Sequence, residues 1–242
     1  MMDSQSTQPK SSWWLAFRVL DEPGAVFAEI AAKPRFLVPF LILFVAAPAF
    51  FAVTAPDSAY QTQVEQSIAI EESRDPGSVT SERRVELMEE AASPTRRAIL
   101  LATGVIGGPI FIAIVAAVLM LIFNAMAADR ITFKQEYSVI LHAWMPQLFT
   151  ALLVPVLAIA GIEQLQLSLG FLFSSDQSSF MYQFANGITL FGAWSMVLVA
   201  MGNQVLSKSS SLGGSLTIVA GLWLLVKVAV AGLASLVGGL AG

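Results

Sequence analysis

Cysteine is absent from this 242-residue chain, histidine occurs once, and charged residues make up only 12% of it. The absence of cysteine excludes disulfide bonds and thiolate metal sites. A single histidine cannot build a metal centre alone. Soluble domains carry about 25% charged residues, so the low charged fraction indicates another class of protein. The net charge of −4 argues against a nucleic-acid partner.

Hydrophobic residues take the place of the missing charge: they make up 56% of the chain, and the mean hydropathy is +0.71. A helix needs about 20 apolar residues to cross a bilayer core, and several runs approach or exceed that length. The sequence therefore predicts an all-α polytopic membrane bundle of five transmembrane helices. We expect the spans at 36–53, 98–123, 139–162, 187–206 and 215–240, within one membrane domain that covers residues 36–242.

Residues 1–35 form a separate N-terminal segment, in which we predict two amphipathic helices too short to span a membrane. Pro23 suits the first turn of the second helix. The segment either lies in the membrane plane or docks a partner, or it packs under the bundle. The expected apolar faces are Trp13, Phe17 and Leu20 in the first helix, and Val26, Phe27 and Ile30 in the second.

The main polar excursion lies between the first two spans, at residues 57–97. It holds nine acids and five bases, so its balance equals the net charge of the whole chain. A turn signal at Asp75–Gly77 separates two stretches of helical periodicity. We expect a helical hairpin outside the membrane. Its acids have no calcium-loop spacing, which favours a solvated face over a cation site.

Proline and glycine mark special places in the spans. Ser93 and Pro94 predict the start of the second span, as N-cap and first helical residue. Gly104 and Gly108 lie four residues apart, so they would share a face that lets another helix approach closely. The alternative is that both glycines simply accompany a kink at Pro109. Further breaks are expected at Pro48, Pro146 and Pro155.

Few polar side chains fall inside or beside the spans, and we single out Asn124, His142 and Lys227. A lone histidine is more often a packed or interfacial residue than a proton relay. Lys227 is predicted near the middle of the bilayer, where it must face the bundle. It would either contact a ligand or anion, or tie helices together. The sequence contains no arrangement typical of catalytic, cofactor-binding or metal-binding residues.

The distribution of lysine and arginine predicts a cytoplasmic N-terminus. With this orientation, seven lysines and arginines lie inside and five outside. The short connections settle the orientation, because Arg130, Lys134 and Lys208 lie on the inner side and the outer connection 163–185 contains no base. A polar hinge at 124–137 would join spans two and three on the inner side. Five is an odd number of spans, so we expect the C-terminus outside.

Three stretches resemble the Yip family of membrane proteins, the Ypt/Rab-interacting proteins and their bacterial relatives. They are EPGAVFAEIAAKPRFLVP before the first span, ITFKQEYSVILHAWMP from hinge to third span, and FGAWSMVLVAMG in the fourth span. The matching positions are Pro23, Phe27, Ile30, Pro34, Pro39, Phe133, Lys134, Tyr137, Pro146, Trp194 and Gly202.

The resemblance implies a five-span bundle with a cytoplasmic N-terminus and a role in membrane organisation or trafficking. The short N-terminal region and large excursion are typical of a bacterial-type member, and imply the inner membrane. The link of eukaryotic members to Rab-type GTPases is not carried over. We expect a non-catalytic scaffold or partner-binding protein that contacts lipid and other membrane proteins or itself. A transporter subunit with a path lined by broken helices and Lys227 is the alternative, and an intramembrane enzyme is least favoured.

Overall fold

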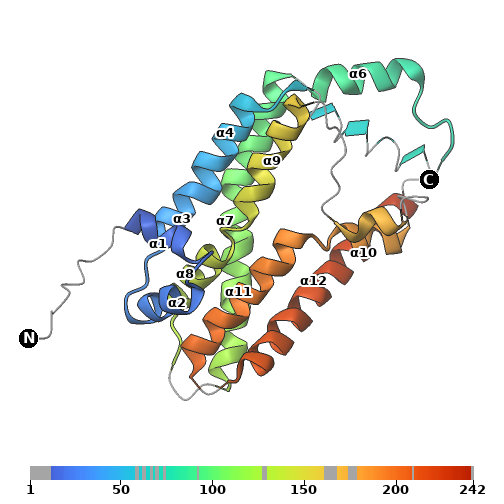
Figure 1. Cartoon of the computed structure of the whole chain (residues 1–242). Coiled ribbons are helices and arrows are strands. Elements are labelled where there is room, and N and C mark those ends of the chain that lie inside the picture. The colour runs from blue at the N-terminus through green and yellow to red at the C-terminus, as the bar shows by residue number, and fades with distance from the viewer. Residues whose placement is uncertain are drawn as a thin grey trace, which may run out of the picture.

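The computed structural model describes residues 12–57, 60, 61, 64, 65, 68, 71, 72, 75–91, 93–126, 130–160, 168–173, 179–208 and 210–240. Residues 1–11, much of the first arm of the predicted hairpin and the start of the 163–185 connection lie outside these ranges. The described chain is all-helical apart from one isolated bridge between Ser168 and Thr189. Figure 1 shows long helices packed side by side, with α1 and α2 against one flank.

Two short helices open the described chain, as the sequence predicts: α1 (Ser12–Arg18) and α2 (Pro23–Ala32), the latter with Pro23 in its first turn. The predicted apolar face of α2 is correct, because Val26, Phe27 and Ile30 are fully buried, and α2 packs on α11 and α8. Of the predicted apolar face of the first helix, Trp13 and Phe17 are exposed and Leu20, just after α1, is half-buried. The residues buried against the bundle are Leu15 and Ala16 of α1, and Val19 just after it.

The first predicted span is one helical path with an irregular middle. It consists of α3 (Leu37–Leu41), a π-helical turn η1 (Ile42–Ala46) and α4 (Ala47–Thr54). Pro48 has no N–H to donate to the preceding turn, and a π-turn is a common way to absorb such a disruption. The expected disturbance at Pro48 therefore takes the form of this turn.

The excursion contributes the helix α6 (Ser81–Ala91), which forms the second arm of the predicted hairpin. Arg84 forms ion pairs with Glu72 and Glu65 of the first arm. At the two ends of the excursion, Arg97 forms an ion pair with Asp57, and the Arg97 guanidinium lies 4.5 Å from the centre of the Tyr60 ring. Several acids of the excursion thus form ion pairs with its arginines. Among the described residues, no group of acids and histidines could hold a metal ion.

Helix α7 (Pro94–Asn124) is the longest element, and it runs through Pro109 without interruption. Ser93 caps it as predicted, because its side chain accepts a hydrogen bond from the backbone N–H of Arg96. Four residues of α7 are buried and most others face outward, including Ile106, Ile110 and Ile114. Such a surface is stable in lipid and not in water.

The predicted third span is two helices, α8 (Phe133–Ala143) and α9 (Gln147–Ile159), and not one helix over 139–162. The chain breaks at the expected Pro146, whereas α9 continues through Pro155. Helix α8 also begins inside the region that the sequence predicts as a polar hinge. Its start is fixed by a capping box, in which Thr132 and Gln135 exchange side-chain and backbone hydrogen bonds.

A short 3₁₀ turn η2 (Leu169–Phe173) and helix α10 (Phe180–Asn186) follow, both within the predicted connection. The oxygen of the Asn186 side chain accepts a hydrogen bond from the Ser168 hydroxyl at 2.8 Å. Helix α10 packs against both η2 and α12. The connection thus places the hydrogen-bonded side chains of Ser168 and Asn186 near the last membrane helix, α12.

Helices α11 (Leu190–Ser207) and α12 (Leu212–Leu240) form an antiparallel pair joined by a tight turn at Lys208. The main core lies between α2, η1, α7, α8, α11 and α12. Four described helical paths are long and apolar enough to cross a membrane, which agrees with four of the predicted spans. They are Leu37–Thr54, Pro94–Asn124, Leu190–Ser207 and Leu212–Gly232.

Candidate functional site

The helices α8 and α11 share a buried polar contact between Glu136 and Asn203. Both side chains are fully buried, and the Nδ2 of Asn203 donates to Oε1 of Glu136 at 2.9 Å. The same amide group donates to the backbone carbonyl of Val199 at 3.1 Å. Glu136 falls in the stretch that the sequence predicts as a polar hinge at 124–137, and in the structure α2, α8 and α11 pack around it.

His142 and Asn124 have local structural partners. His142 is fully buried, and its Nδ1 lies 2.8 Å from the backbone oxygen of Ser138, so Nδ1 carries the proton. Asn124 ends α7 and makes two hydrogen bonds with the backbone of Ile131, donating at 2.9 Å and accepting at 2.7 Å. These bonds close the connection from α7 to α8. Neither residue lines the cavity described below.

Of the two glycines predicted to pack helices, Gly108 lies against another element. A Cβ added at Gly108 would come within 2.4 Å of the ring of Phe44 in η1, whereas nothing described lies within 4 Å at Gly104. A third glycine, Gly202, is packed closely against side chains of two other helices. A Cβ at Gly202 in α11 would lie 2.3 Å from Cγ1 of Val139 in α8 and 3.3 Å from the ring of Phe27 in α2.

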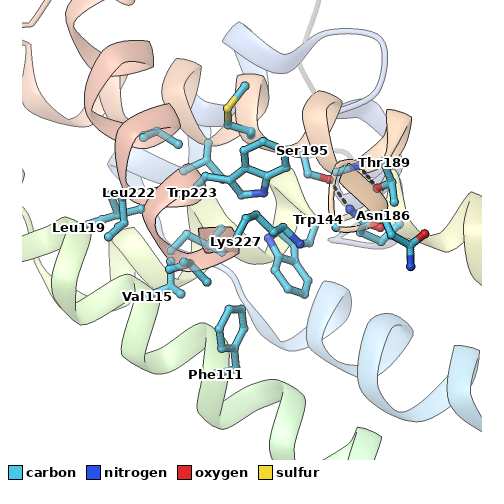
Figure 2. Close-up of a pocket in the computed structure, with 18 residues that line it drawn as sticks. Phe111, Val115, Leu119, Trp144, Asn186, Thr189, Ser195, Leu222, Trp223 and Lys227 are labelled. Atoms are coloured by element: carbon cyan, nitrogen blue, oxygen red, sulfur yellow. Dashed lines mark hydrogen bonds between the residues drawn. The ribbon is translucent and has the colours of Figure 1, made fainter. Parts of the chain in front are cut away.

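A cavity of about 460 Å³ lies between α7, α8, α11 and α12. Its volume falls within the range of about 300–1,000 Å³ that is usual for small-molecule sites. Figure 2 shows one side lined by apolar groups, including Val115, Leu119 and Leu222, and the other side by Asn186, Thr189 and Ser195. The cavity is therefore amphipathic.

Lys227 is the one charged residue among the described residues that line this cavity. Its Nζ lies 5.6 Å from the centre of the Trp223 ring, close enough for a cation–π interaction. In Figure 2 the lysine side chain extends toward the polar side. Its stem passes Gly187 so closely that an added Cβ there would lie 3.1 Å from Cδ. Gly187 comes just before α11, so Lys227 lies level with the start of that helix, and the predicted position near the middle of the bilayer is wrong. No acid among the described residues pairs with Lys227.

Gln147 and Ser195 complete the polar side of the cavity. The Gln147 amide nitrogen lies 3.4 Å from the Ser195 hydroxyl, and Thr189 caps α11 by accepting from the Gly192 N–H at 3.0 Å. The sequence signal for Lys227 is its charge inside an apolar run, and it is sufficient to find that residue. No sequence pattern links it to Gln147, Asn186 or Ser195, because these residues come together only through packing.

A second candidate surface is an aromatic patch on α1, formed by Trp13, Trp14 and Phe17. These side chains are 58%, 56% and 45% exposed. Arg18 holds α1 to the next helix through ion pairs at 2.8 Å with Glu22 and Glu29. The hydrogen bonds that the Arg18 guanidinium donates to Glu22, and then to Glu29, raise the pKa of Arg18 above its ordinary value. The backing of the patch is thus fixed, while its face is open.

Comparison with known families gives one match: a family model described as the Yip1 domain covers residues 17–233. Comparisons with curated proteins and with solved structures find no match. The matched range includes α2 to α11 in full and most of α12. It contains the cavity, the Glu136–Asn203 contact and, from the aromatic patch, Phe17.

Proposed function

The chain belongs to the Yip1 family of integral membrane proteins, and from that premise we propose that it is a non-catalytic scaffold or partner-binding component of a membrane complex. The observation that supports this most directly is the aromatic patch of Trp13, Trp14 and Phe17 on α1. Its partner would be another membrane-associated protein or a second copy of this chain. Exposed tryptophans on a fixed backing are typical of the residues that dominate binding at protein interfaces.

The patch is rigid because its helix is attached at several points. Leu15 and Ala16 on the opposite side of α1, and Val19 just after the helix, are at most 2% exposed and belong to the main core. Helix α1 contacts α3 and α2, and α2 in turn packs on α11. A preorganised surface loses little conformational entropy on binding, which favours a docking role.

A photo-crosslinking amino acid at position 14 tests this proposal in native membranes. We expect recurring protein adducts, identified by mass spectrometry, that disappear when Trp13 and Phe17 are changed to Ala. The matched control is the same probe at Phe133, which is 43% exposed and lies on α8. Lipid adducts alone at position 14 would show that the patch lies in the plane of the membrane, and would overturn the partner-binding role.

We further propose five crossings, with α8 and α9 together making the third. Figure 1 supports this topology, because the last turns of α7 and α11 and the start of α12 lie at one end of the bundle and α6 lies at the other. Arg130 precedes α8, Lys134 is in the first turn of α8, and Lys208 ends α11. We assign this end of the bundle to the cytoplasm. The proposed location is a bacterial inner membrane, with the C-terminus outside.

The cavity beside Lys227 favours a second candidate function, in which the chain is a transporter or permease-like subunit. The π-turn η1 and the break at Trp144–Pro146 interrupt two helical paths, and interrupted helices often line transport routes. A flux assay in proteoliposomes with wild-type protein and Lys227→Met separates the two functions. Flux that depends on Lys227 would favour transport, and its absence together with protein adducts at position 14 would favour the scaffold.

A further inference from the structure

The cavity beside Lys227 combines three features that restrict what can occupy it: a cation without an ion pair among the described residues, an apolar end, and a connection to the lipid-facing surface. Each feature comes from a different set of residues. None of them depends on the partner-binding role proposed above, so either idea can fail without the other.

The cation comes first, because it selects the charge of the ligand. Among the described residues Lys227 makes no ion pair, and none of the described lining residues is acidic. An ammonium group inside a membrane helix is expensive without a partner. The neighbouring amides of Gln147 and Asn186 line the same side of the cavity and supply further N–H donors. This end fits a phosphate or another compact anion.

The opposite end selects the rest of the ligand. Val115 and Leu119 of α7 and Leu222 of α12 line it, and Figure 2 shows them on the side away from Asn186 and Thr189. An aliphatic chain is the group that these side chains accept without leaving a polar atom unpaired. A free inorganic anion would leave this part of the cavity empty.

The cavity wall also reaches the outer surface of α7. Phe111 lines the cavity and is 42% exposed, and its ring lies 6.1 Å from that of Trp144, centre to centre. The adjacent residues Ile110 and Ile114 on α7 are 55% and 58% exposed. In a membrane this surface faces acyl chains, so a lipid tail can reach the cavity without crossing water.

We propose that this cavity is a binding site for an acidic phospholipid of the surrounding bilayer. The phosphate headgroup lies at Lys227 with donors from Gln147 and Asn186, and one acyl chain enters past Phe111 to lie against Leu119 and Leu222. Basic pockets between membrane helices are a common form of headgroup recognition.

Native mass spectrometry of the full-length protein in detergent tests the site with phosphatidylglycerol and phosphatidylcholine as probes. Wild-type protein should retain phosphatidylglycerol over phosphatidylcholine by about fivefold, a typical contribution of one cation. Lys227→Met should abolish this preference and Lys227→Arg should keep it. The matched control is Lys134→Met, which removes a lysine that lies outside the cavity and near the Phe36 ring and should leave the preference unchanged.

A second variant tests the apolar end and does not rely on the lysine. Leu222→Trp fills that end, and should weaken binding of both lipids while the melting temperature in detergent confirms folding. Equal retention of the two lipids by wild-type protein, or an unchanged preference in Lys227→Met, would overturn the proposal. Displacement of phosphatidylglycerol by inorganic phosphate alone would identify a free-anion site instead, and would also overturn it.

Discussion

Asn203 of α11 donates a 2.9 Å hydrogen bond to the carboxyl group of Glu136 in α8, and both side chains are completely buried. The two residues are 67 positions apart in the chain. The contact lies where α2, α8 and α11 meet, and Gln135 next to Glu136 donates to the Ala31 carbonyl at the end of α2 at 2.8 Å. Polar bonds at adjacent positions of α8 therefore join it to two other helices.

Removing one partner of this contact should destabilise the bundle. In Asn203→Leu the buried carboxyl group loses its described donor, at a cost of about 1–3 kcal/mol, and the melting temperature in detergent should fall. Glu136→Gln keeps the size and an acceptor oxygen, and should cost less. The matched control is Gln204→Leu, which changes the next, half-buried residue. Equal melting temperatures for Asn203→Leu and Gln204→Leu would contradict a structural role for the pair.

Gly202→Ala should also destabilise the bundle, because the new methyl group would lie 2.3 Å from Cγ1 of Val139. Valine has a stiff side chain and cannot move aside easily, so we expect a cost of about 1–3 kcal/mol. The double variant Gly202→Ala with Val139→Ala should recover part of the loss. A melting profile of Gly202→Ala identical to that of wild type would refute the close contact.

The two glycines singled out in α7 should respond differently from each other. Gly108→Leu meets the buried ring of Phe44, whereas Gly104→Leu meets open space among the described residues. We expect a lower melting temperature for the first variant and little change for the second. If both variants melt like wild type, packing at Gly108 does not contribute to stability.

The ion pairs of Arg18 should fix α1 locally and contribute little to global stability. Both of its acidic partners are about half exposed, at 52% and 48%, and pairs of this kind are worth about 0–1 kcal/mol. Arg18→Met should leave the melting temperature nearly unchanged but speed amide hydrogen exchange in α1. Arg83→Met on α6, which removes another surface pair, serves as control and should leave exchange in α1 unaltered.

Membrane topology can be measured directly because the chain contains no cysteine. A thiol introduced at Ser211, in the exposed α11–α12 turn, should resist a membrane-impermeant reagent added from outside. A thiol at Ser78, exposed between the two arms of the excursion, should react. The reverse pattern would invert the proposed orientation, and reaction at both sites would exclude the proposed topology.

Local sequence was sufficient for much of the architecture. The apolar runs located four helical paths, and Ser93 with Pro94 identified the start of α7, because cap geometry depends only on neighbouring residues. The start of α8 could also have been found, since Thr132 and Gln135 fit the capping-box spacing. The charges of Lys134 and Glu136 instead made this stretch resemble a polar hinge.

Composition and hydropathy by themselves determined that this is a membrane protein. Long apolar runs with few charges are costly to expose to water, whatever tertiary contacts the helices make. Tertiary structure alone decided which side of α1 is buried and that Glu136 meets Asn203. It also decided that Lys227 shares a cavity with Gln147 and Asn186. These outcomes depend on contacts between residues far apart in the chain, and helical periodicity identifies a face without identifying what packs against it.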